Sequence, residues 1–165
     1  MAKYIRCHIV EAKPMTFGEF SNLRGHDVPG DKDPAEEGYF VEYPDGYTSW
    51  CPKGAFEAAG RQIDNATFGM AIEALKQGRR VTRRGWNGKG MWLWLKPATT
   101  VKVDWCHDPK LKHICEINGG EVEALGSICM KTADNKVLTG WLASQTDMLA
   151  DDWIIDDEGF ESKED

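Results

Sequence analysis

Apolar positions in the first 63 residues come in short groups separated by polar stretches, and they predict a small module of strands and helices. Alternating apolar side chains over residues 3–12 are typical of an edge strand. A short helix is then expected between Thr16, which suits a helix cap, and Gly25, which suits a helix end. The polar, turn-forming residues 26–38 predict a loop.

The same module continues with a predicted hairpin and a second helix. Residues 38–52 surround the turn sequence Pro44-Asp45-Gly46, whose residue types favour a reversal of the chain. A short helix is expected to begin near Pro52, because proline suits the first helical position.

A second module begins at residue 64 with a predicted helix and strand. Asn65 or Thr67 is expected to cap the helix, and Gly78 to end it. In the strand that follows, at residues 79–86, the pattern predicts that Val81 points inward and the arginines point outward.

Asn87-Gly88 is the strongest hairpin signal in the chain and predicts a tight turn into another strand. In that strand Met91, Leu93 and Leu95 alternate with Trp92 and Trp94, so both faces are apolar. We therefore expect both faces to be covered, either inside the fold or by a partner subunit.

The remaining pattern predicts more strands. Residues 101–105 and 113–117 have the character of short strands around a turn at residues 107–109. Residues 127–144 predict a hairpin with Asp134-Asn135 at its turn.

These elements predict an α+β protein, in which a small antiparallel β-sheet domain with short helices is preceded by a small β-hairpin and helix module. We expect residues 1–63 to form the first module, residues 64–156 the second domain, and residues 157–165 an acidic disordered tail.

Charge is distributed unevenly over these segments. The chain of 165 residues carries a net charge of −7, which argues against binding to DNA or RNA. The net charge is −4 over residues 1–64, +4 over residues 65–149 and −7 over residues 150–165. The basic middle favours a small anionic ligand, although some of these charges simply solvate a helix face.

Neither a membrane span of roughly 18 apolar residues nor a signal peptide is evident, so we expect a cytoplasmic protein.

The five cysteines are odd in number and include no C-x-x-C pair, which favours free thiols. A zinc site formed by Cys106, His107, His113 and Cys115 is the alternative. It is disfavoured because the adjacent Cys106 and His107 lack the usual spacer between ligands.

The sequence contains no recognisable catalytic set: G-x-S-x-G, H-E-x-x-H and the P-loop are all absent. Binding is therefore favoured over catalysis, and no cofactor is expected. A divalent-cation site is less well supported than a solvated charged tail for the C-terminal aspartates at positions 151, 152, 156 and 157.

Tryptophan is unusually frequent, with seven residues. For any one of them, core packing is the simplest explanation. Trp86 differs because it lies between Arg83-Arg84 and the glycine-rich turn at residues 87–90. An exposed ring, cations and backbone N–H groups at that point suit an adenine ring with a pyrophosphate.

Two stretches of the second domain resemble a known family. The first contains R-G-W-N-G at residues 84–88, and the second reads W-L-A-S-Q-T-D-M-L-A-D-D-W at residues 141–153. Over about residues 65–155 the chain resembles the phage-encoded Thoeris anti-defence family of the second type. Residues 1–63 are additional to that family and look like a separate small phage domain of unknown role.

The resemblance implies a molecular sponge acting in the host cytoplasm. Such proteins sequester glycocyclic ADP-ribose, the signal made by a TIR-domain defence protein, and some also hold cyclic dinucleotides. They have a small α+β fold, assemble as homotetramers with ligands bound between subunits, and neither make nor break a bond.

Carried across residue by residue, the motifs imply a ligand site with no catalytic or metal-binding residue. The implied ligand-binding residues are Arg84, Gly85, Trp86, Asn87, Ser144, Gln145, Thr146 and Asp147. Structural explanations stay open, because Asp147 suits a helix cap and Asn87 suits a type I′ turn. The spacing of four further residues predicts packing in the core: Trp141, Met148, Leu149 and Trp153.

Two other functions stay open. A phage structural or host-interaction protein would use the exposed aromatic residues to bind a protein partner and would have no nucleotide ligand. An enzyme that degrades the signal is disfavoured by the lack of a nucleophile, a base pair or a metal set.

Overall fold

A computed structural model describes residue 2 and residues 7–156 of the chain. The chain divides into two compact units, Met1–Gln62 and Ile63–Asp165, and each is described by itself. Residues 3–6 of the expected first strand and the expected tail at 157–165 lie outside the described residues. Within the described ranges, no helix is long and apolar enough to cross a membrane.

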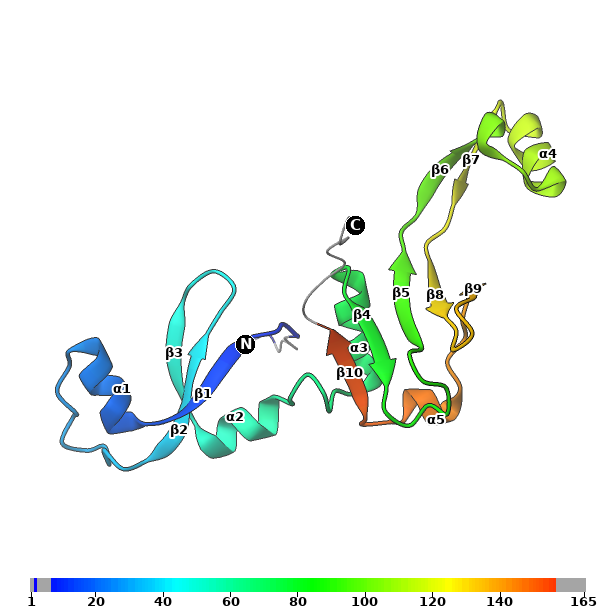
Figure 1. Ribbon diagram of the computed structural model, residues 1–165. Coiled ribbons are helices and arrows are strands. Elements are labelled where there is room, and N and C mark those ends of the chain that lie inside the picture. Colours follow the sequence, from blue (N-terminus) through cyan, green and yellow to red (C-terminus); the bar gives the residue numbers. More distant parts are fainter. Residues whose placement is uncertain (1, 3–6, 157–165) are drawn as a thin grey trace, which may run out of the picture. The chain divides into compact units, whose positions relative to one another are not determined.

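The N-terminal unit is a three-stranded antiparallel sheet with two helices (Figure 1). Its strands are β1 (Glu11–Thr16), β2 (Glu37–Glu42) and β3 (Thr48–Pro52), in the spatial order β1-β2-β3. Helix α1 (Phe17–Arg24) follows β1, and helix α2 (Lys53–Ala59) follows β3. The predicted hairpin and both predicted helices are confirmed.

The first strand lies later than the alternation of apolar residues predicts. It was expected over residues 3–12, but the described residues 7–10 are not in a strand and β1 begins at Glu11. The reason is the length of its partner, because all six residues of β2 pair with residues 11–16. Pro14 is tolerated there because β1 is an edge strand with one neighbour.

Local chemistry fixes the ends of α1. The Thr16 hydroxyl accepts the Glu19 backbone N–H, and the Glu19 carboxylate accepts the Thr16 N–H, which forms a capping box. Gly25 ends the helix with a φ of 69°, a conformation that costs glycine little.

Trp50 organises the core of this unit. Its indole Nε1–H donates to the Met15 carbonyl at 2.9 Å, and its ring packs edge-on to Phe17 with 5.1 Å between centroids. The ring lies so close to Gly38 that a Cβ on that glycine would overlap it. Trp50 is therefore one of the side chains that join the sheet to α1.

The C-terminal unit is built on a five-stranded antiparallel sheet with the order β10-β4-β5-β8-β9 (Figure 1). The strands are β4 (Arg80–Arg83), β5 (Trp92–Lys96), β8 (Ser127–Lys131), β9 (Val137–Thr139) and β10 (Trp153–Asp156). The predicted α+β class, with antiparallel sheets and short helices, is confirmed.

Helix α3 (Phe68–Lys76) covers this sheet. Thr67 caps it by accepting the Met70 N–H, so the second of the two predicted caps is the one used. Its inward residues Ala71 and Leu75 are buried, and they form the core with four sheet residues: Val81, Leu93, Trp153 and Ile155.

Strand β5 is central, but its two faces differ. Leu93 is completely buried, whereas Trp92 and Trp94 are half-buried, with 5.1 Å between their ring centroids. Leu95, on the same face as Leu93, is only half-buried. The described residues therefore bury the Leu93 position but cover neither face along its whole length, and a partner subunit on this strand stays a prediction.

A two-stranded arm continues from β5 and β8 (Figure 1). It contains β6 (Thr99–Lys102), the short 3₁₀ helix η1 (Val103–Trp105), α4 (Pro109–Ile117) and β7 (Glu121–Ala124). The prediction of strands at residues 101–105 and 113–117 was wrong, apart from the first two residues. Asp108 caps α4 and Pro109 begins it, which are helix-start signals that outweigh the β-branched residues.

The predicted tight turn at Asn87-Gly88 was also wrong. Strands β4 and β5 are antiparallel neighbours, but a loop of residues 84–91 joins them. Asn87 does not have the positive φ that a type I′ turn requires; among the described non-glycine residues only Asn135, in the predicted β8–β9 turn, has one.

Candidate functional site

The two sequence motifs meet at one end of the β4–β10 strand pair. Arg83, the last residue of β4, lies opposite Trp153, the first residue of β10. The loop carrying the first motif leaves β4 directly after this pair. The second motif enters β10 directly before it, through the four-residue helix α5 (Gln145–Met148).

Asp147 joins the two motifs. Its Oδ1 accepts Arg83 Nη1–H at 2.7 Å and Trp86 Nε1–H at 3.0 Å. Its Oδ2 accepts the Ser144 backbone N–H at 2.9 Å and the Ser144 hydroxyl at 2.6 Å. Both oxygens are thus engaged inside the protein, and the residue is 8 % exposed.

The cap of α5 differs from the expected one. Ser144, not Asp147, is the cap residue, and Asp147 is the acidic third helical residue of a capping box. The helix spans residues 145–148, so Asp147 lies inside it and not before it. Of the residues predicted to pack inward, Trp153 is buried and Trp141 half-buried, but Met148 and Leu149 are exposed because the helix ends there.

Arg83 is an ion-pair centre that the sequence pattern assigned to the outside. Its side chain is only 13 % exposed, and besides Asp147 it reaches Asp152, with Nε 2.8 Å from Oδ1. Strand alternation in fact places Arg83 on the same face as the buried Val81, two residues earlier, so the prediction that all the arginines point outward was wrong. Two aspartates far along the chain, Asp147 and Asp152, pair with the guanidinium on this inward face.

The pKa values of these groups follow from the hydrogen bonds. Burial alone would raise the pKa of Asp147, but the hydrogen bonds from Ser144, Trp86 and Arg83 outweigh it and hold the pKa well below its usual range. The hydrogen bond from Arg83 is the main cause of the lowered pKa of Asp152. The same bond raises the pKa of Arg83. All three groups are therefore charged at neutral pH.

Gly85 is held by the same cluster. Its backbone N–H donates to Asp152 Oδ2 at 2.6 Å, and a Cβ at this position would overlap that carboxylate. The glycine thus allows the loop to approach the carboxylate closely.

Trp86 is half-buried, whereas the sequence predicts an exposed ring. Its ring meets those of Trp141 and Trp153 edge-to-face, with centroid distances of 6.1 Å and 5.6 Å. Its position is therefore fixed by two rings and by the carboxylate of Asp147.

The other motif residues face solvent. Arg84 is exposed and donates to the Asp64 carbonyl at 2.8 Å and to Asn65 Oδ1 at 3.2 Å. The side chains of Asn87 and Gln145 are exposed and make no hydrogen bond to another described residue. Thr146 is exposed as well, with its hydroxyl 2.8 Å from that of Ser144.

The eight predicted ligand-binding residues thus fall into two groups. Four belong to the hydrogen-bonded cluster around Asp147, and four are exposed next to it: Gly85, Trp86, Ser144 and Asp147 in the first group, and Arg84, Asn87, Gln145 and Thr146 in the second. Sequence reasoning missed two members of the cluster, Arg83 and Asp152. The available signals were positional, since Asp152 directly precedes the motif residue Trp153, and Arg83 shares the strand face of Val81 two residues earlier. In the described ranges, no group of three or more His, Cys, Asp or Glu residues is arranged to hold a metal.

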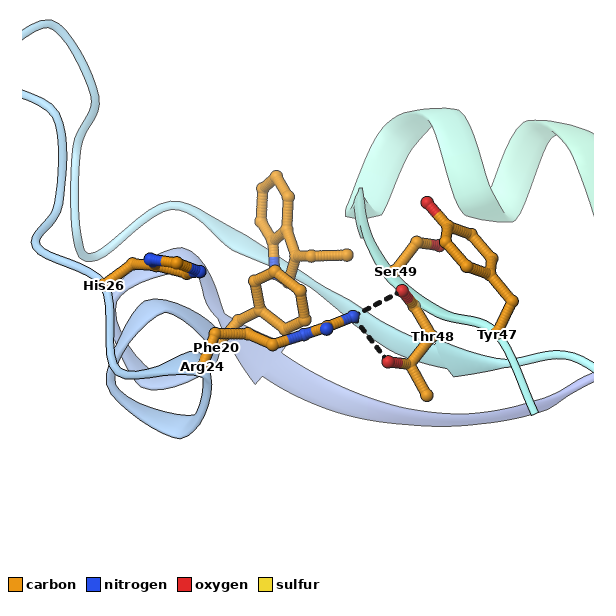
Figure 2. A pocket seen from close by; sticks show the side chains of 7 residues that line it. Phe20, Arg24, His26, Tyr47, Thr48 and Ser49 are labelled. Carbon is orange, nitrogen blue, oxygen red and sulfur yellow. Dashed lines mark hydrogen bonds between the residues drawn. The ribbon is translucent and has the colours of Figure 1, made fainter.

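The N-terminal unit has a shallow pocket of its own, of about 320 Å³. In Figure 2 the Arg24 side chain crosses it and donates to the Thr48 carbonyl and hydroxyl, at 2.7 Å and 2.6 Å. The pocket is lined by Phe20, Arg24, His26, Tyr47, Thr48, Ser49 and Trp50. It contains none of the predicted ligand-binding residues, so the pocket and the motifs belong to different units.

The fold and the site together define a small α+β domain, in which an antiparallel sheet carries two polar loops at the end of one strand pair. Residues 66–155 match the model of the Tad2-like family, described as the Thoeris anti-defense 2-like domain. The chain is also 45 % identical over 89 residues to Thoeris anti-defense 2 of Bacillus phage SP01, an alignment that covers 54 % of this chain and 92 % of that relative. The chain therefore belongs to the Tad2-like family, as the sequence motifs indicate. This membership supports a phage anti-defence role.

Proposed function

We propose that the protein binds and sequesters a cyclic nucleotide immune signal inside the infected cell without degrading it. Glycocyclic ADP-ribose is the proposed ligand, and cyclic dinucleotides are further candidates. Family membership supports the anti-defence role, and the arrangement of the two motifs supports binding as the mechanism.

One observation carries the proposal. Trp86 and Asp147 belong to the two separate motifs, and the indole N–H donates to the carboxylate at 3.0 Å. This contact fixes the two loops against each other before any ligand arrives, so the ordering cost of binding is already met by folding.

The exposed groups around this fixed centre have the chemistry that a nucleotide requires. Arg84 supplies a guanidinium, which suits a phosphate oxygen. Asn87 and Gln145 supply amides that both donate and accept, which suits a base edge or a ribose hydroxyl. Their amides have no partner among the described residues, and the turn conformation does not require Asn87.

We extend the proposal to a homo-oligomer with a second copy next to this site. Leu142 and Leu149 flank α5 and are 88 % and 80 % exposed. Exposed apolar side chains that gather on one surface are typical of protein–protein contacts, and these two leucines are the apolar groups that a second copy would cover here. Light scattering coupled to size-exclusion chromatography measures the assembly directly, and a monomer at all concentrations contradicts this part of the proposal.

Capture followed by heat release tests the function. The full-length protein is mixed with glycocyclic ADP-ribose and, separately, with a panel of cyclic dinucleotides, and filtrates are analysed before and after denaturation. Loss of a ligand from the filtrate and its return intact on heating is the expected result. An altered ligand would establish enzymatic turnover, and no capture of any ligand would favour a protein-interaction function.

The variant Asn87→Ala/Gln145→Ala locates the site, because neither side chain contributes a described contact to the folded protein. We expect it to weaken capture at least tenfold while the melting temperature stays unchanged. Gln77→Ala is the matched control, since it removes an exposed amide from the same unit at the end of α3. Unchanged capture by the double variant would place the ligand elsewhere.

A further inference from the structure

Two cysteines meet at the tip of the arm. Cys106 follows η1 and Cys115 lies in α4, and their Sγ atoms are 3.6 Å apart. Cys115 is completely buried, whereas Cys106 is half-buried. Both are free thiols, with carbonyl acceptors at 3.4 Å from Cys106 Sγ and 3.6 Å from Cys115 Sγ.

This pair is not part of the zinc site that the sequence left open. A structural zinc site takes four ligands, and no set of three or more candidate ligands is assembled in the described part of the chain. The contact therefore brings together two sulfur atoms and no other candidate ligand.

The geometry suits a disulfide. A disulfide bond is about 2.05 Å long, so the two sulfurs, 3.6 Å apart, need to approach by only about 1.5 Å. The backbone around them is held by the hydrogen bonds from Cys106 N–H to the Val103 carbonyl, 3.2 Å, and from Gly120 N–H to the Cys115 carbonyl, 2.8 Å.

We propose that Cys106 and Cys115 form a dithiol modification site that exchanges with small-molecule disulfides, such as oxidised glutathione, to give a reversible intramolecular disulfide. This site is independent of the proposed ligand-binding function.

The chemistry balances in two steps. The Cys106 thiolate attacks one sulfur of oxidised glutathione, forms a mixed disulfide and displaces one glutathione thiolate, which takes up the proton. Cys115 then loses its proton, attacks Cys106 Sγ and displaces the second glutathione. Two protein thiols are oxidised and one glutathione disulfide is reduced to two thiols.

The roles of the two cysteines follow from their surroundings. Only Cys106 is accessible to a dissolved disulfide, so it is the attacking thiol. Burial raises the pKa of the Cys115 thiol, which disfavours its thiolate and its direct reaction with solutes. Cys115 therefore acts second, when its partner is already within reach.

Thiol mapping of the full-length protein tests this site. After incubation with oxidised glutathione, the protein is unfolded in urea at low pH, the remaining thiols, including the buried Cys129, are blocked with N-ethylmaleimide in the denaturant, and intact mass and peptides are analysed. We expect a species lighter by two hydrogens before blocking, with three of the five cysteines blocked and a peptide linking positions 106 and 115. Five reactive thiols, stable glutathione adducts only, or a link to another cysteine would overturn the proposal.

The variant Cys115→Ala separates the two steps. Without the second thiol, the glutathione adduct on Cys106 should accumulate, whereas the wild-type protein passes through it. Cys129→Ala removes another buried cysteine of the same unit and should keep the wild-type peptide map. If Cys115→Ala does not fold, the wild-type map and the Cys129→Ala control still decide the proposal.

Discussion

The substitution Asp147→Asn tests whether the charge cluster holds the two motif loops together. The carboxylate accepts four hydrogen bonds, two on each oxygen, from Arg83, Trp86 and Ser144. Asparagine has the same shape but only one oxygen. In either orientation of its amide, two of the donors face an NH₂ group instead of an acceptor.

The expected cost follows from these contacts. Removing one partner of a buried ion pair costs about 3–5 kcal/mol. Here Arg83 keeps Asp152, with 2.8 Å between Nε and Oδ1, so the remaining charge is not left alone. Two lost hydrogen bonds that involve a charged group, at about 1.5 kcal/mol each, give a destabilisation of about 3 kcal/mol.

Urea unfolding followed by tryptophan fluorescence measures this cost. Six of the seven tryptophans lie in the C-terminal unit, so the signal reports mainly on that unit. We expect a lower midpoint with an unchanged m-value. Asp104→Asn is the control, because Asp104 is exposed and lies in the same unit; its effect should stay within about 0.5 kcal/mol.

A double-mutant cycle makes the test specific. Trp86→Phe removes one of the donors to Asp147, so Asp147→Asn should cost less in that background than in the wild-type protein. A loss below about 0.5 kcal/mol for Asp147→Asn, or strictly additive losses in the cycle, would refute the role of the cluster as the connection between the motifs.

Three further predictions concern stability. The two aspartates of the cluster have lowered pKa values in the folded state, so their contribution is present above the unfolded value of about 3.9. It is lost as pH falls through the folded pKa. At pH values below about 4 the urea midpoint of the wild-type protein should therefore decrease, and that of Asp147→Asn should decrease less steeply. Gly38→Ala should destabilise the N-terminal unit by about 1–3 kcal/mol because its Cβ overlaps Trp50, whereas Gly54→Ala in α2, with open space around it, should stabilise by about 0.5–1 kcal/mol in thermal unfolding. Thr67→Ala should cost about 1 kcal/mol in the same assay, through loss of the cap of α3.

The elements that the sequence predicts correctly are those with local chemical signals at both ends. Thr16 and Gly25 define α1 because the cap and the left-handed residue are properties of the chain next to them. The same is true of the β8–β9 turn, where Asn135 has a φ of 60°. Such signals need no knowledge of the rest of the fold.

The wrong predictions arise where a pattern was given more weight than an end signal. Residues 113–117 are rich in apolar side chains and were predicted as a strand, although Asp108 and Pro109 have the residue types of a helix start. Asn87-Gly88 has the composition of a tight turn, but the loop it lies in is fixed by Gly85 binding to Asp152. Turn composition carries no information about that distant carboxylate.

The candidate site shows why a motif identifies a family more readily than it assigns roles. Arg83 lies 64 residues from Asp147 and 69 from Asp152, so its burial depends on the pairing of β4 with β10. Once that pairing exists, Asp147 is occupied by internal donors. The exposed residues Asn87 and Gln145 are left as the groups that can contact a ligand without first breaking a contact in the protein. The motif therefore combines residues that fold the two loops with residues that the folded loops present to solvent. Under the proposed function, we expect a substitution in the first group to change stability and binding together, and one in the second group to change binding alone.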